Sequence, residues 1–186
     1  MEHIYQREGF GENWFTYPEL YSQIIDRLPN GSTIVEIGSW KGKSISYFVV
    51  EAANRGKQIS AYAVDTWKGS DEHTDYTEIK SDTLYELFLN NTAPIKDMFQ
   101  HIRKPSLEAA NDFEDDSVDF VFIDAAHDYE SVKADISAWI PKVKSKGIIA
   151  GHDYLYEGVK KAVDEYFGNA VLFRNAMENC WIVEIE

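Results

Sequence analysis

Residues 119–130 read DFVFIDAAHDYE, and residues 147–154 read GIIAGHDY. In each stretch a short apolar run is followed by ionisable residues, which are Asp124, His127, Asp128, His152 and Asp153. An unbroken apolar run is typical of a strand buried on both faces, as in a parallel sheet covered by helices. A charge at the end of such a strand is costly unless the carboxylate faces a cleft. The two stretches therefore predict two buried strands whose ends share a polar site.

Working outward from these stretches, strand and helix patterns alternate along the chain. We expect strands at 32–38, 59–65, 98–103, 117–125 and 147–153, and helices at 43–54, 81–91, 106–112 and 157–167. Two further helices are marked by apolar spacing: one follows a capping-box pattern at Thr16–Glu19, and one runs over Val132–Ile140 until Pro141 stops it. Residues 170–175 and 180–185 are predicted to close the sheet as an antiparallel pair. This order predicts an α/β fold with a mostly parallel sheet covered on both faces.

The remaining segments lack a clear period. Residues 68–80 (KGSDEHTDYTEIK) are predicted to be a loop or lid, and the first 15 residues look irregular. No repeat, low-complexity tract or linker divides the chain, so we expect one domain over 1–186, in which 1–30 form an N-terminal lid and helix. In such a fold, ligands bind outside the carboxyl ends of the strands.

Composition narrows the classes of partner. Lys and Arg number 18 against 32 Asp and Glu, which gives a net charge of −14. That average field repels nucleic acid. The sequence has no apolar run of membrane-spanning length and no leader-like apolar region near residue 1, so we expect a cytoplasmic protein without membrane contact. The single cysteine, Cys180, is expected to be a buried thiol.

The loop after the first predicted strand reads VEIGSWKGKS at 35–44. Three kinds of nucleotide-binding loop can be compared with it. A P-loop needs a glycine five positions before Gly42, where Ile37 stands, and small residues where Trp40 stands. A dinucleotide fingerprint needs G-x-G-x-x-G, whereas this loop is E-x-G-x-x-x-G. A nucleoside without phosphate tolerates both Trp40 and Glu36, and the acid favours a ligand that carries a cationic centre.

These features resemble the class I S-adenosylmethionine-dependent methyltransferases over nearly the whole chain. The resemblance implies a Rossmann-like sheet of seven strands, with the last strand antiparallel. It also implies that the loop holds the methionyl end and the ribose, that Asp65 binds the ribose hydroxyls, and that Thr66, Trp67 and Ser106 approach the adenine. The implied cofactor-binding residues are Glu36, Gly38, Ser39, Trp40, Gly42, Ser44, Asp65, Thr66, Trp67, Ser106 and Asp124. Singly, Asp65 or Ser106 could be a capping residue; their recurrence at successive strand ends favours binding.

The two opening stretches resemble the metal-dependent O-methyltransferases, namely the catechol type and, more closely, the branch that acts on sugar hydroxyls of natural products. This resemblance implies Asp124 and Asp153 as ligands of a divalent metal and His127 as general base. His152, the third candidate metal ligand, stands where relatives carry Asp or Glu. Magnesium prefers oxygen ligands, whereas a histidine ligand favours manganese or iron. Asp128 is expected to cap the following helix.

The expected function is therefore metal-assisted methyl transfer from S-adenosylmethionine to a hydroxyl of a small molecule, such as a sugar, glycoside or catechol. Two alternatives stay open. A metal-dependent hydrolase would use the histidines and aspartates, but it leaves four residues without a role: Glu36, Gly38, Gly42 and Asp65. A module that binds the cofactor without catalysis would keep the same residues. A homo-oligomer that completes the pocket is also left open.

Overall fold

The computed structural model describes residues 1–173 and 177–186, and it confirms the predicted fold class. Its strands are β1 Ser32–Ile37, β2 Ile59–Asp65, β3 Gln100–Arg103, β4 Val118–Ile123, β5 Val143–Gly151, β6 Leu172–Phe173 and β7 Trp181–Glu184. They form one sheet in the order β3-β2-β1-β4-β5-β7-β6. The first five strands pair in parallel, and β7 pairs antiparallel with both β5 and β6.

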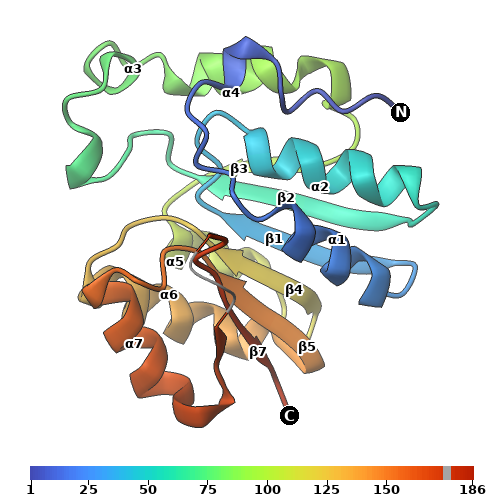
Figure 1. The fold of residues 1–186 in the computed structure, drawn as a ribbon, viewed down its shortest axis with the longest axis vertical. Helices are drawn as coiled ribbons and strands as arrows, with labels where there is room; N and C mark the ends of the chain where they lie inside the picture. The colour runs from blue at the N-terminus through green and yellow to red at the C-terminus, as the bar shows by residue number, and fades with distance from the viewer. Residues whose placement is uncertain (174–176) are drawn as a thin grey trace.

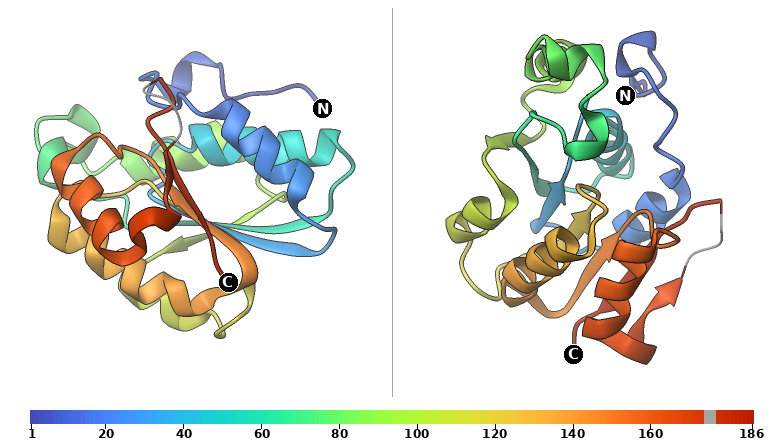
Figure 2. Two further views of the ribbon diagram at one scale, coloured as in Figure 1. Left: turned by 60° about the horizontal axis from the view of Figure 1, so that its bottom comes forward. Right: turned by 90° about the vertical axis from the view of Figure 1, so that its left-hand side faces the viewer.

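Helices cover both faces of the sheet (Figures 1 and 2). They are α1 Pro18–Arg27, α2 Lys43–Asn54, α3 Thr77–Lys80, α4 Leu84–Thr92, α5 Ser106–Ala109, α6 Tyr129–Trp139 and α7 Glu157–Phe167. Successive strand residues point to opposite faces. Phe120 and Phe122 accordingly pack into the core formed with α1, α2 and α4, whereas Val121 and Ile123 pack into the core formed with α5, α6 and α7. The unbroken apolar run of β4 is thus buried on both sides.

Several boundaries differ from the sequence prediction. The capping box at Thr16–Glu19 is wrong: Tyr17 precedes α1 without a side-chain cap, and the Thr16 hydroxyl instead donates to the carbonyl of Glu178 at 3.3 Å. The 68–80 segment is partly helical, with a 3₁₀ turn at Asp71–His73 followed by α3.

The end of the sheet differs in detail as well. β5 begins four residues earlier than expected, and a register shift between Val118 and Phe120 accommodates the extra length against β4. Of the strand predicted at 170–175, Leu172–Phe173 form β6, while residues 174–175 lie outside the described residues.

The strand order reverses between β1 and β4, and this places the site. From β1 the chain continues outward through β2 and β3, whereas from β4 it continues through β5 on the other side. The loops that follow β1 and β4 therefore diverge and open a crevice at the carboxyl ends of the strands. Gly38 and Asp124 stand at these two ends, each joined to the neighbouring strand by a backbone hydrogen bond.

Across residues 1–173 and 177–186, the structure contains no helix with the length and apolar character needed to cross a membrane.

Candidate active site

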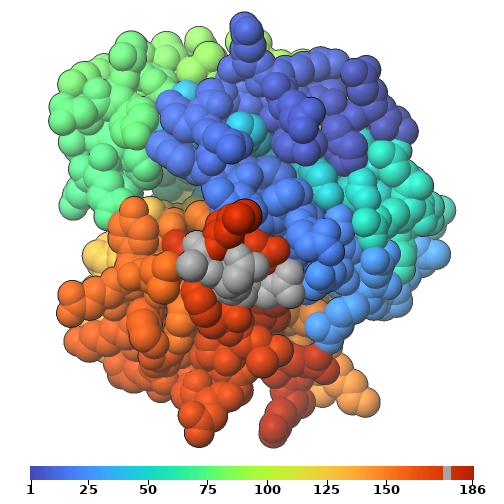
Figure 3. All heavy atoms as spheres, in the orientation of Figure 1, coloured from blue at the N-terminus to red at the C-terminus, as the bar shows by residue number. Residues whose placement is uncertain are grey.

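A cavity of about 710 Å³ occupies the crevice. Its floor comes from the ends of β1, β2, β4 and β5, and its walls come from three segments: residues 10–17, residues 69–76, and Met177 with Asn179. We call residues 68–80 the insert. Figure 3 shows a hollow between the insert, in green, and the yellow and orange residues that follow β4 and β5, with the blue N-terminal segment alongside.

The loop after β1 takes a conformation that requires glycine at its first position. Gly38 has φ 84°, and a Cβ added there would lie 1.9 Å from the carbonyl oxygen of Asp124. No L side chain fits so close to another backbone. Gly38 thereby allows the ends of β1 and β4 to approach each other under the cavity.

Asp65 fixes the rest of this loop. Its Oδ2 accepts hydrogen bonds from the backbone N–H groups of Ser39 at 2.8 Å and Trp40 at 2.9 Å, and its Oδ1 accepts from the N–H of Trp67 at 2.7 Å. Burial raises the pKa of Asp65, and these backbone donors partly oppose that effect. A carboxylate can accept about four hydrogen bonds, so these three leave Asp65, which lines the cavity, at most one further acceptor position.

Glu36 and Gly42 lie behind the loop and do not line the cavity. Glu36 is 2% exposed and accepts hydrogen bonds from the Tyr21 hydroxyl and the Ser39 hydroxyl, both at 2.8 Å. Burial raises the pKa of Glu36 to about 7. Gly42, with φ 87°, is the N-cap of α2 and packs against Phe88. Both residues shape the loop from beneath.

Trp67 was predicted to approach the adenine, but it does not line the cavity. It is 1% exposed and packs in the core against Phe88, with ring centroids 4.5 Å apart, while its indole N–H donates to the carbonyl of Trp40. The backbone of Trp67 is left-handed (φ 53°), and the ring points inward. The position of Trp67 in the sequence does not reveal this direction. Thr66 and Ser106 do line the cavity, and the Ser106 hydroxyl accepts from Trp139 at 2.8 Å.

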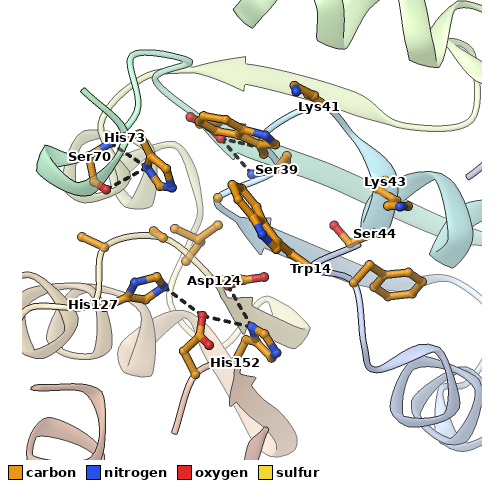
Figure 4. A pocket seen from close by; sticks show the side chains of 18 of the residues that line it. Trp14, Ser39, Lys41, Lys43, Ser44, Ser70, His73, Asp124, His127 and His152 are labelled. Atoms are coloured by element: carbon orange, nitrogen blue, oxygen red, sulfur yellow. Dashed lines mark hydrogen bonds and ion pairs between the residues drawn. The ribbon is translucent and has the colours of Figure 1, made fainter. Parts of the chain in front are cut away.

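The ionisable residues after β4 and β5 converge at the other end of the cavity. Asp124, His152 and Asp153 each offer one ligand atom, and these atoms all lie within 4.8 Å of one another. His152 Nδ1 is 3.5 Å from Asp124 Oδ1 and 3.1 Å from Asp153 Oδ2. Figure 4 shows Asp124 and His152 next to each other at this end of the cavity, with a dashed line between their side chains.

A side chain from elsewhere holds the outer atom of each member of this cluster. The Tyr17 hydroxyl donates to Asp124 Oδ2 at 2.8 Å, Thr16 Oγ1 lies 3.2 Å from His152 Nε2, and the Asn179 amide donates to Asp153 Oδ1 at 3.1 Å. Each inner atom is left facing the common point. Such outer partners are what fixes the orientation of metal ligands in proteins.

His127 lies between two carboxylates. Its Nε2 is 2.9 Å from Asp153 Oδ2, and its Nδ1 is 2.7 Å from Glu72 Oε2 in the insert. Sequence reasoning missed Glu72, because it is one acid in a polar segment without a period. Asp128 accepts from the backbone N–H of Ser131 at 3.0 Å and caps α6, which confirms its expected role.

These contacts determine the charges. Burial lowers the pKa of His127, but hydrogen bonds to Asp153 and Glu72 outweigh it and raise that pKa to about 9. Burial likewise disfavours charge on His152, yet Asp124 and Asp153 raise its pKa to about 10. Although burial opposes it, the two histidines hold the pKa of Asp153 well below its usual range. The cluster therefore favours positive charge between its carboxylates.

Four aromatic rings form one wall of the cavity, which we call the aromatic wall: Trp14, Trp40, His73 and Tyr76. The ring centroids of Trp40 and His73 are 4.6 Å apart, and those of Trp14 and Trp40 are 5.6 Å apart. Trp14 is 42% exposed and projects into the middle of the site (Figure 4). His73 also forms a capping box with Ser70 at the start of the 3₁₀ turn.

Comparison with known proteins identifies the family of the chain. The methyltransferase domain family matches residues 35–154, more than half of the chain. A Sinorhizobium fredii protein (strain NBRC 101917 / NGR234), named "Uncharacterized protein y4gI", is 34% identical over 120 residues. The match covers 64% of this chain and 13% of that protein, so the chain spans only a small part of this curated relative.

Solved structures share the fold at low sequence identity. The O-methyltransferase NovP superposes with a TM-score of 0.68 at 15% identity, over 91% of this chain and 79% of NovP. The methyltransferase MycE, in complex with Mg, S-adenosylhomocysteine and mycinamycin VI, gives 0.61 at 15% identity, over 97% and 52% of the two chains. CalS11, a TDP-rhamnose 3'-O-methyltransferase, gives 0.59 at 13% identity, over 90% and 76%.

Solved methyltransferases therefore share the fold of the chain. The chain belongs to the methyltransferase domain family.

Proposed function

We propose that the protein transfers the methyl group of S-adenosylmethionine to a hydroxyl of a small molecule that carries neighbouring hydroxyls, such as a sugar, a glycoside or a catechol-like diol, with assistance from a divalent metal. One observation carries the proposal: the loop held by Asp65 and the cluster of Asp124, His152 and Asp153 line two ends of the same cavity.

The cofactor end has the donors and acceptors that a nucleoside needs. The acceptor position that Asp65 has left can accept from a ribose hydroxyl, and hydrogen bonds to a charged acceptor are the strong ones. Ser39, Ser44, Thr66 and Ser106 line the same region with hydroxyl groups. We assign the ribose to Asp65 and the adenine edge to Thr66 and Ser106.

The residues of the cluster fit a divalent metal. Two carboxylate oxygens and one imidazole nitrogen face a common point, and hydrogen bonds hold the outer atom of each residue. We assign Asp124, His152 and Asp153 as the ligands, with Mg or Mn as the ion. When bound, such an ion lowers the pKa of a hydroxyl and fixes its orientation.

His127 is assigned as the general base. It lines the cavity beside Asp153, and its ring, whose pKa the two carboxylates raise to about 9, can accept a hydroxyl proton in its neutral form. A bound S-adenosylmethionine would supply the methyl group to that oxygen and would be left as S-adenosylhomocysteine, while His127 would hold the proton of the hydroxyl. Holding both reactants in one enclosed cavity supplies much of the acceleration.

The relatives support the acceptor class. NovP is an O-methyltransferase, CalS11 acts on TDP-rhamnose, and MycE is complexed with Mg, S-adenosylhomocysteine and mycinamycin VI. The identities are low, so these names support the proposal only through the shared fold.

Calorimetric titration of S-adenosylhomocysteine into the protein, with and without Mg or Mn, tests the proposal. We expect micromolar or tighter binding, and separate binding of Mn that an Asp153→Asn variant loses while its affinity for S-adenosylhomocysteine is retained. Absence of cofactor binding under every condition would overturn the methyltransferase assignment. Cofactor binding without metal binding would overturn only the assignment of the metal site.

A further inference from the structure

Lys41 lies in the loop after β1 and lines the cavity, yet it is only 8% exposed. Figure 4 shows it on the side of the cavity away from His127 and His152. Removing an ammonium group from water is costly unless acidic partners compensate its charge. The surroundings of Lys41 must therefore supply such partners.

Two carboxylates meet at this ammonium group, and they come from two different segments of the cavity wall. Glu12 belongs to residues 10–17, which we call the N-terminal segment, and its Oε2 lies 3.1 Å from Lys41 Nζ. Glu78 belongs to α3 in the insert, and its Oε1 lies 2.5 Å from the same nitrogen. Burial lowers the pKa of Lys41, but hydrogen bonds to Glu78 and Glu12 outweigh it and raise that pKa. Lys41 is thus charged and joins the two segments through one atom.

This bridge differs from the ion pairs on the surface of the insert. Lys68 pairs with Asp82 at 2.6 Å, and both side chains are more than half exposed, so water screens that pair. The side chain of Glu78 is 12% exposed, so removing its partner leaves a poorly hydrated charge without compensation. Among the described residues, Lys41 is the one cation that forms ion pairs with both the N-terminal segment and the insert.

The backbone of Lys41 is anchored to the rest of the fold. Its carbonyl accepts a hydrogen bond from the amide of Asn91 in α4 at 3.1 Å, and the same amide donates to the carbonyl of Gly9 at 2.9 Å. The N-terminal segment then passes directly over the ammonium group, because a Cβ added to Gly11 would lie 2.9 Å from Lys41 Nζ. Lys41 is therefore a fixed point against which the N-terminal segment packs.

The residue before Lys41 contacts the same two segments through its ring. The centroid of Trp40 lies 5.6 Å from that of Trp14 in the N-terminal segment and 4.6 Å from that of His73 in the insert. The backbone N–H of Trp40 donates to Asp65 at the other end of the cavity. One loop thus reaches Asp65 and also both segments of the wall.

We propose that Lys41 is a positioning residue that assembles the acceptor site: its ammonium group holds the N-terminal segment and the insert against the loop after β1, and so keeps the rings of the aromatic wall in contact. Without this charge, Glu12 and Glu78 lose their shared partner, and hydration of the Glu78 carboxylate draws the insert toward solvent. The inference rests on the proposed function, since that function assigns the acceptor to this part of the cavity.

The test removes the bridge as a whole and then one side at a time. Lys41→Met removes the charge and keeps a long unbranched side chain, whereas Glu12→Gln and Glu78→Gln each remove one carboxylate. Lys68→Met is the matched control, because it breaks an ion pair of the insert that does not reach the N-terminal segment. The readout is millisecond-to-second hydrogen exchange of backbone N–H groups in the two segments and in β1, β2 and β4. This measurement needs neither cofactor nor acceptor.

We expect Lys41→Met to raise exchange roughly 10-fold in both segments and to leave the strands unchanged. Glu12→Gln should raise exchange in the N-terminal segment, Glu78→Gln in the insert, and Lys68→Met in neither. Unchanged exchange in either segment of Lys41→Met would overturn the inference. A rise in the strands as large as that in the segments would also overturn it, because it would report a general loss of stability.

Kinetics with an acceptor that is turned over separate positioning from a purely structural role. A site that is assembled only part of the time binds its ligand with an affinity reduced by that fraction. Lys41→Met should therefore raise the KM for the acceptor roughly 10-fold, while kcat and the affinity for S-adenosylhomocysteine change less than about twofold. A fall in kcat with an unchanged KM would contradict the inference. Failure of the wild-type protein to bind S-adenosylhomocysteine would instead overturn the proposed function and leave the exchange result standing.

Discussion

The two ends of the cavity, which the proposed function assigns to the cofactor and to the acceptor, are built in different ways. The cofactor end uses the ends of β1 and β2, where backbone N–H groups and one carboxylate hold the loop around Gly38 and Asp65. The acceptor end combines residues from the N-terminal segment, the insert and the region near Asn179, which meet only in the folded chain. We infer that the cofactor end is fixed by the sheet, whereas the acceptor end depends on how three irregular segments pack.

Gly38→Ala should have the largest effect, because it acts on the part that the sheet fixes. The added methyl group would meet the backbone of Asp124 at 1.9 Å, and that backbone belongs to the strand end that carries the cluster. We expect complete loss of S-adenosylhomocysteine binding and a large fall in the free energy of unfolding, measured by urea denaturation.

Gly31→Ala is the matched control for that variant. Gly31 has the same φ of 84°, but nothing lies within 4 Å of an added Cβ. It should therefore show only the cost of a left-handed alanine, roughly 1–2 kcal/mol, and retain full binding. If both variants lose the same stability and Gly38→Ala still binds, the close approach of β1 and β4 is not what the cofactor end requires.

The same contrast explains how far the sequence predicted the site. Asp65, Asp124 and His152 were predictable because the first ends a buried strand and the other two directly follow one, and parallel strands bring such residues to one edge. Thr16, Glu72 and Asn179 were not, because they come from segments without a period and are placed by tertiary contacts alone. Trp67 was misplaced for a related reason: a strand end gives the position of a residue, but a left-handed turn can direct its side chain into the core.

Asp65→Asn should have an intermediate effect, confined to the cofactor end. The variant keeps the shape of the side chain but loses the charge. Both oxygens of Asp65 accept from backbone N–H groups, so the amide N–H₂ of the variant must face one of these donors without forming a hydrogen bond. We expect S-adenosylhomocysteine affinity to fall roughly 10- to 100-fold, as for the loss of one or two charged hydrogen bonds. Titration calorimetry measures this loss.

Metal binding at the other end sharpens this second test. Mn affinity should be unchanged in Asp65→Asn, since Asp65 is not a member of the cluster. The exposed Asp97→Asn serves as the control for a lost carboxylate and should alter neither affinity. An Asp65→Asn variant that binds S-adenosylhomocysteine like the wild type would remove the ribose assignment.

Trp14→Ala should have the smallest effect and tests the boundary between the two ends. Trp14 is the most exposed tryptophan of the described residues, and its ring contacts Trp40 of the loop as well as His73 and Tyr76 of the insert. If the aromatic wall serves the acceptor, removing this ring should raise the KM for the acceptor roughly 3- to 10-fold, the range expected for one aromatic contact. S-adenosylhomocysteine affinity should change less than twofold. If S-adenosylhomocysteine affinity falls as much as KM rises, the aromatic wall belongs to the cofactor end. The two ends would then form one continuous surface, closed by the N-terminal segment.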